Sequence, residues 1–337
     1  MSTDERDATE RLSRRPWPAT RRNDQIEVSF EFFPPANDEG TVALRRCVEH
    51  LAPLGPRFVS VTYGAGGTTQ DRTLNAVQNI CAVASVPVAG HLTCVGATKA
   101  EVADVIDAYL TAGVRHIVAL RGDPPAGSDD GSVPGGYTSA AELVAGIRRH
   151  ADAYRMDIDI AVAAYPEGHP RAASAAADLD NLKAKLDAGA TQAITQFFFD
   201  PEVFLRFLDR ARAAGITAPI VPGIMPITSF AGIRRFSERC GTDLPAWVHD
   251  LFADLDDMPD VRQLVAATVA AEQCRRLAEH GVDRFHFYTM NRPELTAATC
   301  RILGLKPVSD PVADPMAEQA AELVSDFAGA ALPVRSA

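Results

Sequence analysis

Apolar and polar residues follow one pattern four times along the chain: an amphipathic helical stretch, a glycine, and a run rich in β-formers. The glycines at these junctions are Gly113, Gly189, Gly215 and Gly281. Because glycine adopts the left-handed conformation just past a helix end at little cost, each segment predicts a helix, a C-cap and a strand. TKAE at 98–101 adds a capping box at the start of one such helix. The four segments are AYLTAGVRHIVAL (108–120), KLDAGATQAITQFF (185–198), RARAAGITAPIVPGI (210–224) and RLAEHGVDRFHFYT (276–289).

The same pattern, extended over the chain, predicts eight strands, most of them separated by a single helix. They cover residues 26–33, 57–63, 87–93, 115–120, 158–164, 192–198, 218–224 and 284–289. Strands that alternate with helices form parallel sheets, and eight of them favour a closed (β/α)8 TIM barrel. The gap before the eighth strand is longer and predicts two or three extra helices. A doubly wound open sheet is the structural alternative.

Polar residues gather where the predicted strands end, and reactive groups of barrels lie at that end. The first strand, VSFEFFPP (28–35), carries Glu31 among valine and phenylalanine, where an unpaired charge costs several kcal/mol. Later strands end in VTYGAGG, HLTC, ALRGD, AAYPEGHP, TQFFFD and YTMNR. Side chains two residues apart share a face of a strand, so Ser29 and Glu31 are expected to point into the barrel together. The same holds for the pairs Ser60 and Thr62, and His91 and Thr93.

Each of these residues also has a purely structural interpretation. Glu31 is compatible with an ion pair to a nearby arginine, and Asp123 in RGDPP with a turn before proline. His91 is compatible with a hydrogen-bonded core histidine. YGAGGTTQ (63–70) lies between a strand and a helix, but Thr69 replaces the third glycine of a dinucleotide fingerprint, so it is a weak Rossmann motif.

The helix predicted after AAYPEGHP carries Asp178, Asn181 and Lys185 at positions i, i+3 and i+7, which places them on one face. A solvated polar stripe is one interpretation of this face. The other is a surface along which an extended cofactor with phosphate and ribose groups lies.

Composition narrows the functional classes. The chain has 337 residues, of which 47% are hydrophobic and 23% charged, as in ordinary globular proteins. The net charge of −11 argues against nucleic acid as a partner, and the chain has no apolar run of membrane-spanning length. Six scattered cysteines without a CxxC pair indicate reduced thiols of a cytoplasmic protein, and eight histidines without metal-binding spacing argue against zinc.

Three segments are expected: a disordered leader over 1–25, a catalytic barrel over 26–306 and a partly helical tail over 307–337. The acidic residues of the leader argue against a mitochondrial presequence. A homo-oligomer is compatible with the sequence, which does not decide the oligomeric state.

The motifs FEFFPP, VTYGAGG, HLTC, LRGD, AAYPEGHP, ITQFFFD, PGIMP and FHFYTMNR, in this order, resemble the blocks of methylenetetrahydrofolate reductases of the bacterial catalytic-domain type. The resemblance runs from about residue 26 to 306. It implies a flavin-containing (β/α)8 barrel that binds FAD and uses NADH or NADPH as co-substrate. It also implies reduction of 5,10-methylenetetrahydrofolate to 5-methyltetrahydrofolate by ping-pong hydride transfer through flavin N5, which supplies methyl groups for methionine synthesis.

The resemblance assigns roles to individual residues. Glu31 is implied to be the general acid that protonates the folate nitrogen, with its pKa raised by burial in an apolar strand. Asp123 is implied to stabilise the folate cation and to make the reduced flavin a better hydride donor. Gln196, Phe236 and Arg292 are implied to bind substrate. The implied cofactor contacts are Thr62, Tyr63, Ala65, His91, Leu120, Arg121, Gly122, Asp123, Tyr137, Thr138, Tyr165, His169, Asp178, Asn181 and Lys185.

The chain departs from the family pattern at two positions. Gly232 stands where relatives often have a polar side chain, and Ala184 where some have a second basic residue. Longer relatives carry a regulatory domain that binds S-adenosylmethionine, and the length of this chain leads us to expect no feedback inhibition of that kind. Two other functions remain open: a pterin-binding barrel that transfers a group without redox chemistry, and a flavin- or folate-binding protein without activity.

Overall fold

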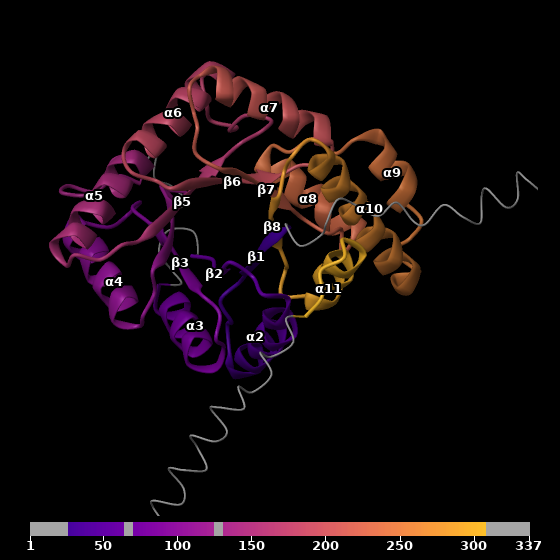
Figure 1. The fold of residues 1–337 in the computed structure, drawn as a ribbon, viewed down its shortest axis with the longest axis horizontal. Helices are drawn as coiled ribbons and strands as arrows, with labels where there is room; N and C mark the ends of the chain where they lie inside the picture. Colours follow the sequence, from indigo (N-terminus) through magenta and orange to yellow (C-terminus); the bar gives the residue numbers. More distant parts are fainter. Residues whose placement is uncertain (1–25, 64–69, 125–130, 308–337) are drawn as a thin grey trace, which may run out of the picture.

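The computed structural model describes residues 26–63, 70–124 and 131–307. Within these ranges eight parallel strands close into a barrel in which each strand pairs with the next, and the eighth pairs with the first (Figure 1). The predicted (β/α)8 barrel is confirmed, and the open doubly wound sheet is wrong. The strands are β1 (Glu27–Phe32), β2 (Val59–Val61), β3 (Val88–Thr93), β4 (His116–Leu120), β5 (Asp159–Ala164), β6 (Gln192–Phe197), β7 (Ile220–Ile224) and β8 (Arg284–Tyr288).

Helices form a ring outside the strands (Figure 1). The expected extra helices between the seventh and eighth strands are α8, α9 and α10. No helix in the described part of the chain is long and apolar enough to cross a membrane. The helices are α2 (Asp38–Leu51), the short 3₁₀ helix η2 (Ala52–Leu54), α3 (Gln70–Val83), α4 (Lys99–Thr111), α5 (Ala140–Ala153), α6 (Ala175–Asp187), α7 (Pro201–Ala213), α8 (Phe230–Cys240), α9 (Ala246–Phe252), α10 (Pro259–Glu279) and α11 (Pro293–Ile302).

The local sequence signals act as expected at the helix ends. The hydroxyl of Thr98 accepts from the backbone of Glu101, and the Glu101 carboxylate accepts from the backbone of Thr98, so the predicted capping box is present at the start of α4. The four junction glycines all have positive φ, between 81° and 115°. These glycines end their helices and direct the chain into the next strand.

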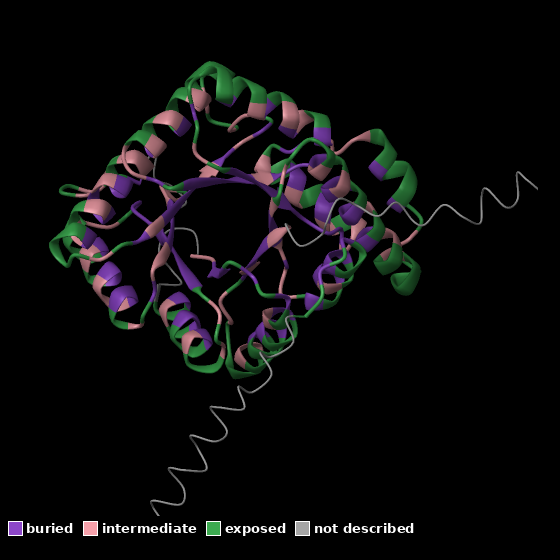
Figure 2. Cartoon of the chain, in the orientation of Figure 1, coloured by how far each residue is buried: buried purple, intermediate pink, exposed green. Residues whose placement is uncertain are grey.

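Two apolar layers hold the barrel, and a third cluster, which includes Phe197, Phe252 and Ala266, joins α8, α9 and α10 to the end of β6. The larger layer lies between the strands and the surrounding helices, and Figure 2 shows the strands buried and the outward helix faces exposed. The smaller layer fills the barrel interior with Phe58, Ala89, Val118, Ile194 and neighbouring residues. Residues two positions further along each strand share this inward face but lie nearer the C-terminal mouth. The inward face gains polar side chains near the mouth on some strands, such as His91 and Gln196, and stays apolar on others, such as Leu120.

The second strand is shorter than predicted, three residues in place of seven. The leader and nearly all of the tail lie outside the described residues, so the predictions for 1–25 and 307–337 stay predictions.

Candidate active site

The barrel interior opens at its C-terminal end into a cavity of about 830 Å³, which includes the open mouth. We call it the central cavity. Glu31 from β1 and His91 from β3 supply polar groups to its wall. Gln196 and Thr289 are the other polar residues of the wall. The rest is apolar or aromatic and is formed by Phe32, Phe33, Val118, Leu120, Val162, Ala163, Tyr165, Ile194, Met225, Phe236, Tyr288 and Met290. A flat, partly apolar ring system fits such a wall.

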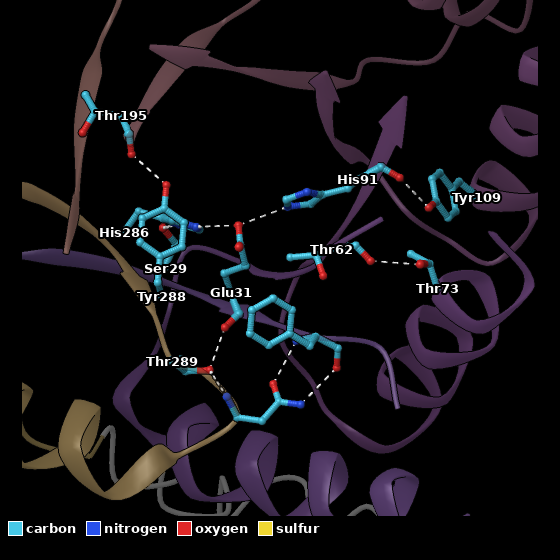
Figure 3. Close-up of polar contacts among 12 residues, drawn as sticks. Ser29, Glu31, Thr62, Thr73, His91, Tyr109, Thr195, His286, Tyr288 and Thr289 are labelled. Carbon is cyan, nitrogen blue, oxygen red and sulfur yellow. Dashed lines mark hydrogen bonds and ion pairs between the residues drawn. The ribbon is translucent and has the colours of Figure 1, made fainter. Parts of the chain in front are cut away.

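The Glu31 carboxylate lies between two imidazoles (Figure 3). Its Oε2 is 3.2 Å from Nε2 of His91 and 3.4 Å from Nε2 of His286. The His91 nitrogen is within ion-pair distance of the carboxylate but is not well aligned for a hydrogen bond. Nδ1 of His286 in turn lies 2.7 Å from the hydroxyl of Ser29. The arginine partner considered for Glu31 is therefore wrong, because its partners are histidines.

These contacts also correct the prediction for the Glu31 pKa. Burial of the carboxyl opposes its ionisation, which was the reason to expect a raised pKa. The two adjacent imidazoles outweigh that cost and lower the pKa of Glu31 to about 2. The expectation of a raised pKa is wrong, and Glu31 is ionised at neutral pH in this structure.

The pairing of the first and last strands positions this cluster. Ser29 lies opposite His286 in the β1–β8 register, and Glu31 lies opposite Tyr288. The hydroxyl of Thr289 donates to the Glu31 backbone carbonyl at 2.6 Å. His286 was missed by sequence reasoning, although the two-residue spacing of His286 and Tyr288 on the predicted eighth strand matches that of Ser29 and Glu31.

Two predicted substrate-binding residues line the central cavity. The Phe236 ring of α8 stacks on Phe197 of β6, with ring centroids 5.5 Å apart and planes at 13°. Gln196 precedes Phe197 and accepts a hydrogen bond from its backbone at 3.0 Å through the side-chain oxygen. The structure thus brings Gln196 and Phe236 to the same cavity as Glu31.

A second cavity of about 1270 Å³, including open solvent, extends over the ends of β4 and β5 to α6. We call it the lateral cavity. It shares Leu120, Ala163 and Tyr165 with the central cavity, so the two are adjacent. Seven other predicted cofactor contacts also line it: Arg121, Gly122, Asp123, His169, Asp178, Asn181 and Lys185. Arg171, which was not predicted, lines it as well.

Lys185 is the most unusual of these residues, because its side chain is buried, at 7% exposure. Its Nζ donates to the carbonyl of Ala163 at 2.6 Å. Burial lowers the pKa of Lys185 to about 8, although the Asp178 carboxylate opposes that shift. Asp178 also accepts from the backbone of His169 at 3.1 Å. The predicted polar face of α6 therefore lines the lateral cavity, with Lys185 buried, Asp178 half-buried and Asn181 exposed to solvent.

Asp123 lies at the exposed rim of the lateral cavity. Its carboxylate is 3.1 Å from Nη2 of Arg171, and the two side chains are 78% and 48% exposed. A pair this exposed contributes little to stability. The preceding Gly122 has φ of 88°, and a Cβ there would lie 2.9 Å from a Val95 methyl, so the glycine lets this backbone pass close to β3.

Other predicted site residues lie elsewhere. The ring of Tyr137 packs on Gly146 of α5, and neither it nor Thr138 lines the two cavities. Arg292 is exposed at the start of α11. Thr62 and Tyr63 follow β2 without lining either cavity, and Ala65 lies outside the described residues. The roles of these residues stay predictions.

A closed parallel barrel with an acid and an imidazole in the wall of the cavity at its C-terminal end is the arrangement of the (β/α)8 class of enzymes. Among the described residues no group of three or more histidine, cysteine or acidic side chains is arranged to hold a metal ion. The comparisons with known proteins identify the family.

The family model for methylenetetrahydrofolate reductase matches residues 18–304, and the chain belongs to this family of oxidoreductases. The 5,10-methylenetetrahydrofolate reductase of Escherichia coli is 47% identical over 283 residues, covering 84% of this chain and 92% of the relative. The methylenetetrahydrofolate reductase (NADH) 1 of Arabidopsis thaliana is 37% identical and covers 83% of this chain, which spans 49% of that relative.

Among solved structures, a protein from Clostridium thermocellum described as binding two copies of 5-methyl-5,6,7,8-tetrahydrofolic acid has a similar fold. Its TM-score is 0.55 at 15% identity, over 83% of this chain and 95% of that chain. At this identity the similarity concerns the fold alone.

Proposed function

We propose that the protein reduces 5,10-methylenetetrahydrofolate to 5-methyltetrahydrofolate, with FAD as its bound cofactor and NADH or NADPH as the electron donor. The observation that carries the proposal is the family membership together with an acidic side chain in the wall of the central cavity. The product would serve as a methyl donor for methionine synthesis.

The lateral cavity has the features that a flavin dinucleotide needs. Arg121, Arg171 and Lys185 line it and offer cations to a pyrophosphate. The N-terminal ends of α5 and α6 border it, and helix N-termini favour anions. Asp178 and Asn181 offer partners for hydroxyl groups. These residues fit FAD, and the adjacent central cavity leaves space for a flat ring beside Glu31.

When bound, FAD supplies the redox chemistry, accepting a hydride from the nicotinamide nucleotide and donating it to the folate. The residues of the chain prepare the folate. Opening of its five-membered ring requires a proton on the departing nitrogen, and Glu31 is the acid positioned in the central cavity to give it. Asp123, at the rim of the adjoining cavity, offers a negative charge that stabilises the cation produced by ring opening.

Phe236 and Gln196 position the substrate in this scheme. The Phe236 ring is held by its stack on Phe197, which gives an aromatic wall for a nicotinamide or pterin ring. Gln196 lines the same cavity with an amide that can donate to either substrate. One cavity that serves both substrates in turn agrees with a ping-pong sequence.

Rapid-mixing absorbance tests the function. NADH or NADPH should bleach the visible flavin bands of the anaerobic holoenzyme, and methylenetetrahydrofolate should restore them. A purified protein that is colourless and takes up no added FAD would contradict the proposal, and would favour the pterin-binding transferase. Flavin that NADH bleaches but no folate recolours would favour a different acceptor.

The Glu31→Gln variant tests the assigned acid. It should leave flavin bleaching by NADH within about twofold of wild type, and should slow folate reduction by at least about 100-fold, the range expected for a lost general acid. Equal losses in both half-reactions would show that Glu31 holds the site together and does not act as the acid.

A further inference from the structure

His286 contacts Glu31 from behind the central cavity. Its side chain is fully buried, with 0% exposure, and it does not line the cavity wall, whereas His91 does. A ligand in the cavity therefore reaches His91 and Glu31, but reaches His286 only through Glu31.

Ser29 is the other polar contact of the His286 ring. Its hydroxyl is buried, at 4% exposure, and the ring nitrogen Nδ1 at 2.7 Å is its one hydrogen-bond partner within the described residues. A serine hydroxyl can rotate, so it accepts from Nδ1 when that nitrogen carries hydrogen and donates to it when it does not. Ser29 therefore satisfies Nδ1 in both charge states of the ring, which a carboxylate or a backbone carbonyl would not do.

We propose that His286, held by Ser29, is a positioning residue that stores the acid proton of the site and passes it to Glu31 during folate reduction. This inference rests on the proposed function. It resolves a conflict in the site: an acid is needed in the central cavity, but the carboxylate that lies there is ionised while the imidazoles accompany it.

The transfer balances in atoms and charge. In the loaded site the His286 ring carries hydrogen on both nitrogens, and Glu31 is a carboxylate. The Nε2–H bond breaks, its electron pair stays on Nε2, and an O–H bond forms at Oε2 of Glu31. Glu31 then gives that proton to the departing folate nitrogen and returns to the carboxylate. The neutral His286 ring keeps its Nδ1–H bond to Ser29 and, because it is buried behind Glu31, regains a proton from water through the Glu31 carboxylate between turnovers.

The other groups around the His286 ring do not compete for this proton. From β1 it faces Ser29 and Glu31, and from the segment before β2 the ring of Phe58, at 5.9 Å between centroids. On its own strand Tyr288 packs at 5.4 Å. Burial raises the pKa of Tyr288 well above its usual range, and its hydroxyl donates to a β6 carbonyl at 2.7 Å.

The remaining neighbours add one more titratable group. The paired position on β7 is Gly223, which has no side chain. His91 of β3 contacts the same Glu31 oxygen and is the other charged or titratable group at the carboxylate.

The Ser29→Ala variant tests the inference through its pH profile. Without the hydroxyl, the doubly protonated ring would hold a buried Nδ1–H without a partner. Hydrogen bonds to charged groups are stronger than those to neutral ones, so the loss disfavours the charged ring. The alkaline limb of the folate half-reaction should therefore move to lower pH by about one unit, while the rate at its low-pH plateau stays within about threefold of wild type. Flavin bleaching by NADH should keep its wild-type pH profile.

Ser60→Ala is the matched control. Ser60 is also a buried barrel serine and lies opposite Glu31 in the β1–β2 register, but its hydroxyl has no hydrogen-bond partner among the residues that the structure describes. Its variant should keep the wild-type limb. Ser29→Thr keeps a hydroxyl and should show the wild-type alkaline limb in the pH profile of the folate half-reaction. Ser29→Cys is close to serine in size, but its thiol is a weaker hydrogen-bond partner, so its alkaline limb should move in the same direction as that of Ser29→Ala.

A second measurement does not depend on activity. Imidazole ¹⁵N resonances of the ligand-free protein are followed against pH, and the one that disappears in His286→Gln is assigned to His286. In Ser29→Ala its midpoint should fall, and in Ser60→Ala it should stay. An unchanged midpoint and an unchanged limb in Ser29→Ala would overturn the inference. If wild type does not reduce the folate at all, the proposed function fails, and the resonance titration still tests the Ser29–His286 coupling.

Discussion

Replacement of the buried Lys185 by methionine should make the stability of the protein less dependent on alkaline pH. Lys185 is a cation with little access to water, and its Nζ has one carbonyl, that of Ala163, within hydrogen-bond reach in the described residues. We expect such a costly arrangement to be retained because it binds a negatively charged ligand in the lateral cavity. Lys185→Met removes the charge but keeps an apolar chain of similar length.

The magnitude follows from the lowered pKa of Lys185, which falls from 10.5 to about 8. The shift of about 2.5 units corresponds to about 3 kcal/mol. Below pH 8 the native state carries the full cost of the buried charge. Between pH 8 and 10.5 the unfolded chain binds more protons than the native one, so wild-type stability rises relative to the variant, and above 10.5 the cost disappears. The variant also loses the hydrogen bond to Ala163, about 1.5–3 kcal/mol at neutral pH, so the slope with pH is more diagnostic than the sign at one pH.

Urea unfolding of both proteins without ligand, at pH 7, 8, 9 and 10, measures the difference. The stability of Lys185→Met minus that of wild type should fall by roughly 2 kcal/mol between pH 7 and pH 10. Lys183→Met is the control, because Lys183 lies on the same helix, is 43% exposed and pairs with Asp187; its difference should stay flat. If the stability difference between Lys185→Met and wild type also stays constant with pH, Lys185 is not a buried cation with a lowered pKa. The variant should also bind FAD more weakly than wild type at pH 7.

Three further predictions concern the barrel and its mouth. Asp123→Asn should keep flavin binding and slow folate reduction by at least about tenfold in stopped-flow assays. Wild-type rates in this variant would mean that Asp123 has only a structural role in the turn before proline. Gly223→Ala should destabilise the protein by more than about 2 kcal/mol in urea, because its Cβ would lie 2.2 Å from the Thr195 carbonyl oxygen. Gly232→Ala is the matched comparison, because a Cβ at this helical position would have no contact below 3.4 Å, and the variant should gain about 0.5–1 kcal/mol of stability. Equal losses of stability in Gly223→Ala and Gly232→Ala would contradict the steric argument. The ionised Glu31 carboxylate should stabilise the fold above pH 4.5, and this contribution should disappear as pH falls towards 2. The urea midpoints of wild type and Glu31→Gln should therefore converge between these pH values. Midpoints that keep a constant difference over this pH range would exclude the lowered pKa.

Local patterns carried most of the fold prediction. The junction glycines and the capping box of Thr98 have their effect within a few residues, so the sequence alone was enough to place them. Period-two alternation placed Glu31 and His91 on the inward face, and both reach the central cavity. The alternation of strands and helices followed from the same rules, whereas closure of the sheet was one of two alternatives and β2 is shorter than predicted.

The chemistry of the site was harder to predict, because it depends on contacts between distant strands. Burial of Glu31 was inferred correctly, but His91, together with His286, which lies 255 residues away, reverses the direction of the pKa shift. Tyr137 shows the same limit: its loop follows β4 as expected, yet the ring packs on a glycine of α5. Which way a loop side chain points is decided by packing partners that a single sequence does not reveal.

The acid centre stands on the seam where the first strand of the barrel meets the last. A chain that has emerged from the ribosome only as far as β7 already contains Glu31 and His91 but has no β8 to pair with β1, so the second imidazole partner of Glu31, His286, is missing. The complete cluster around Glu31 therefore requires β8 to be paired beside β1. Half-made molecules would lack both the ring closure and the complete cluster of Glu31, His91 and His286, so this arrangement exists only in a completed barrel.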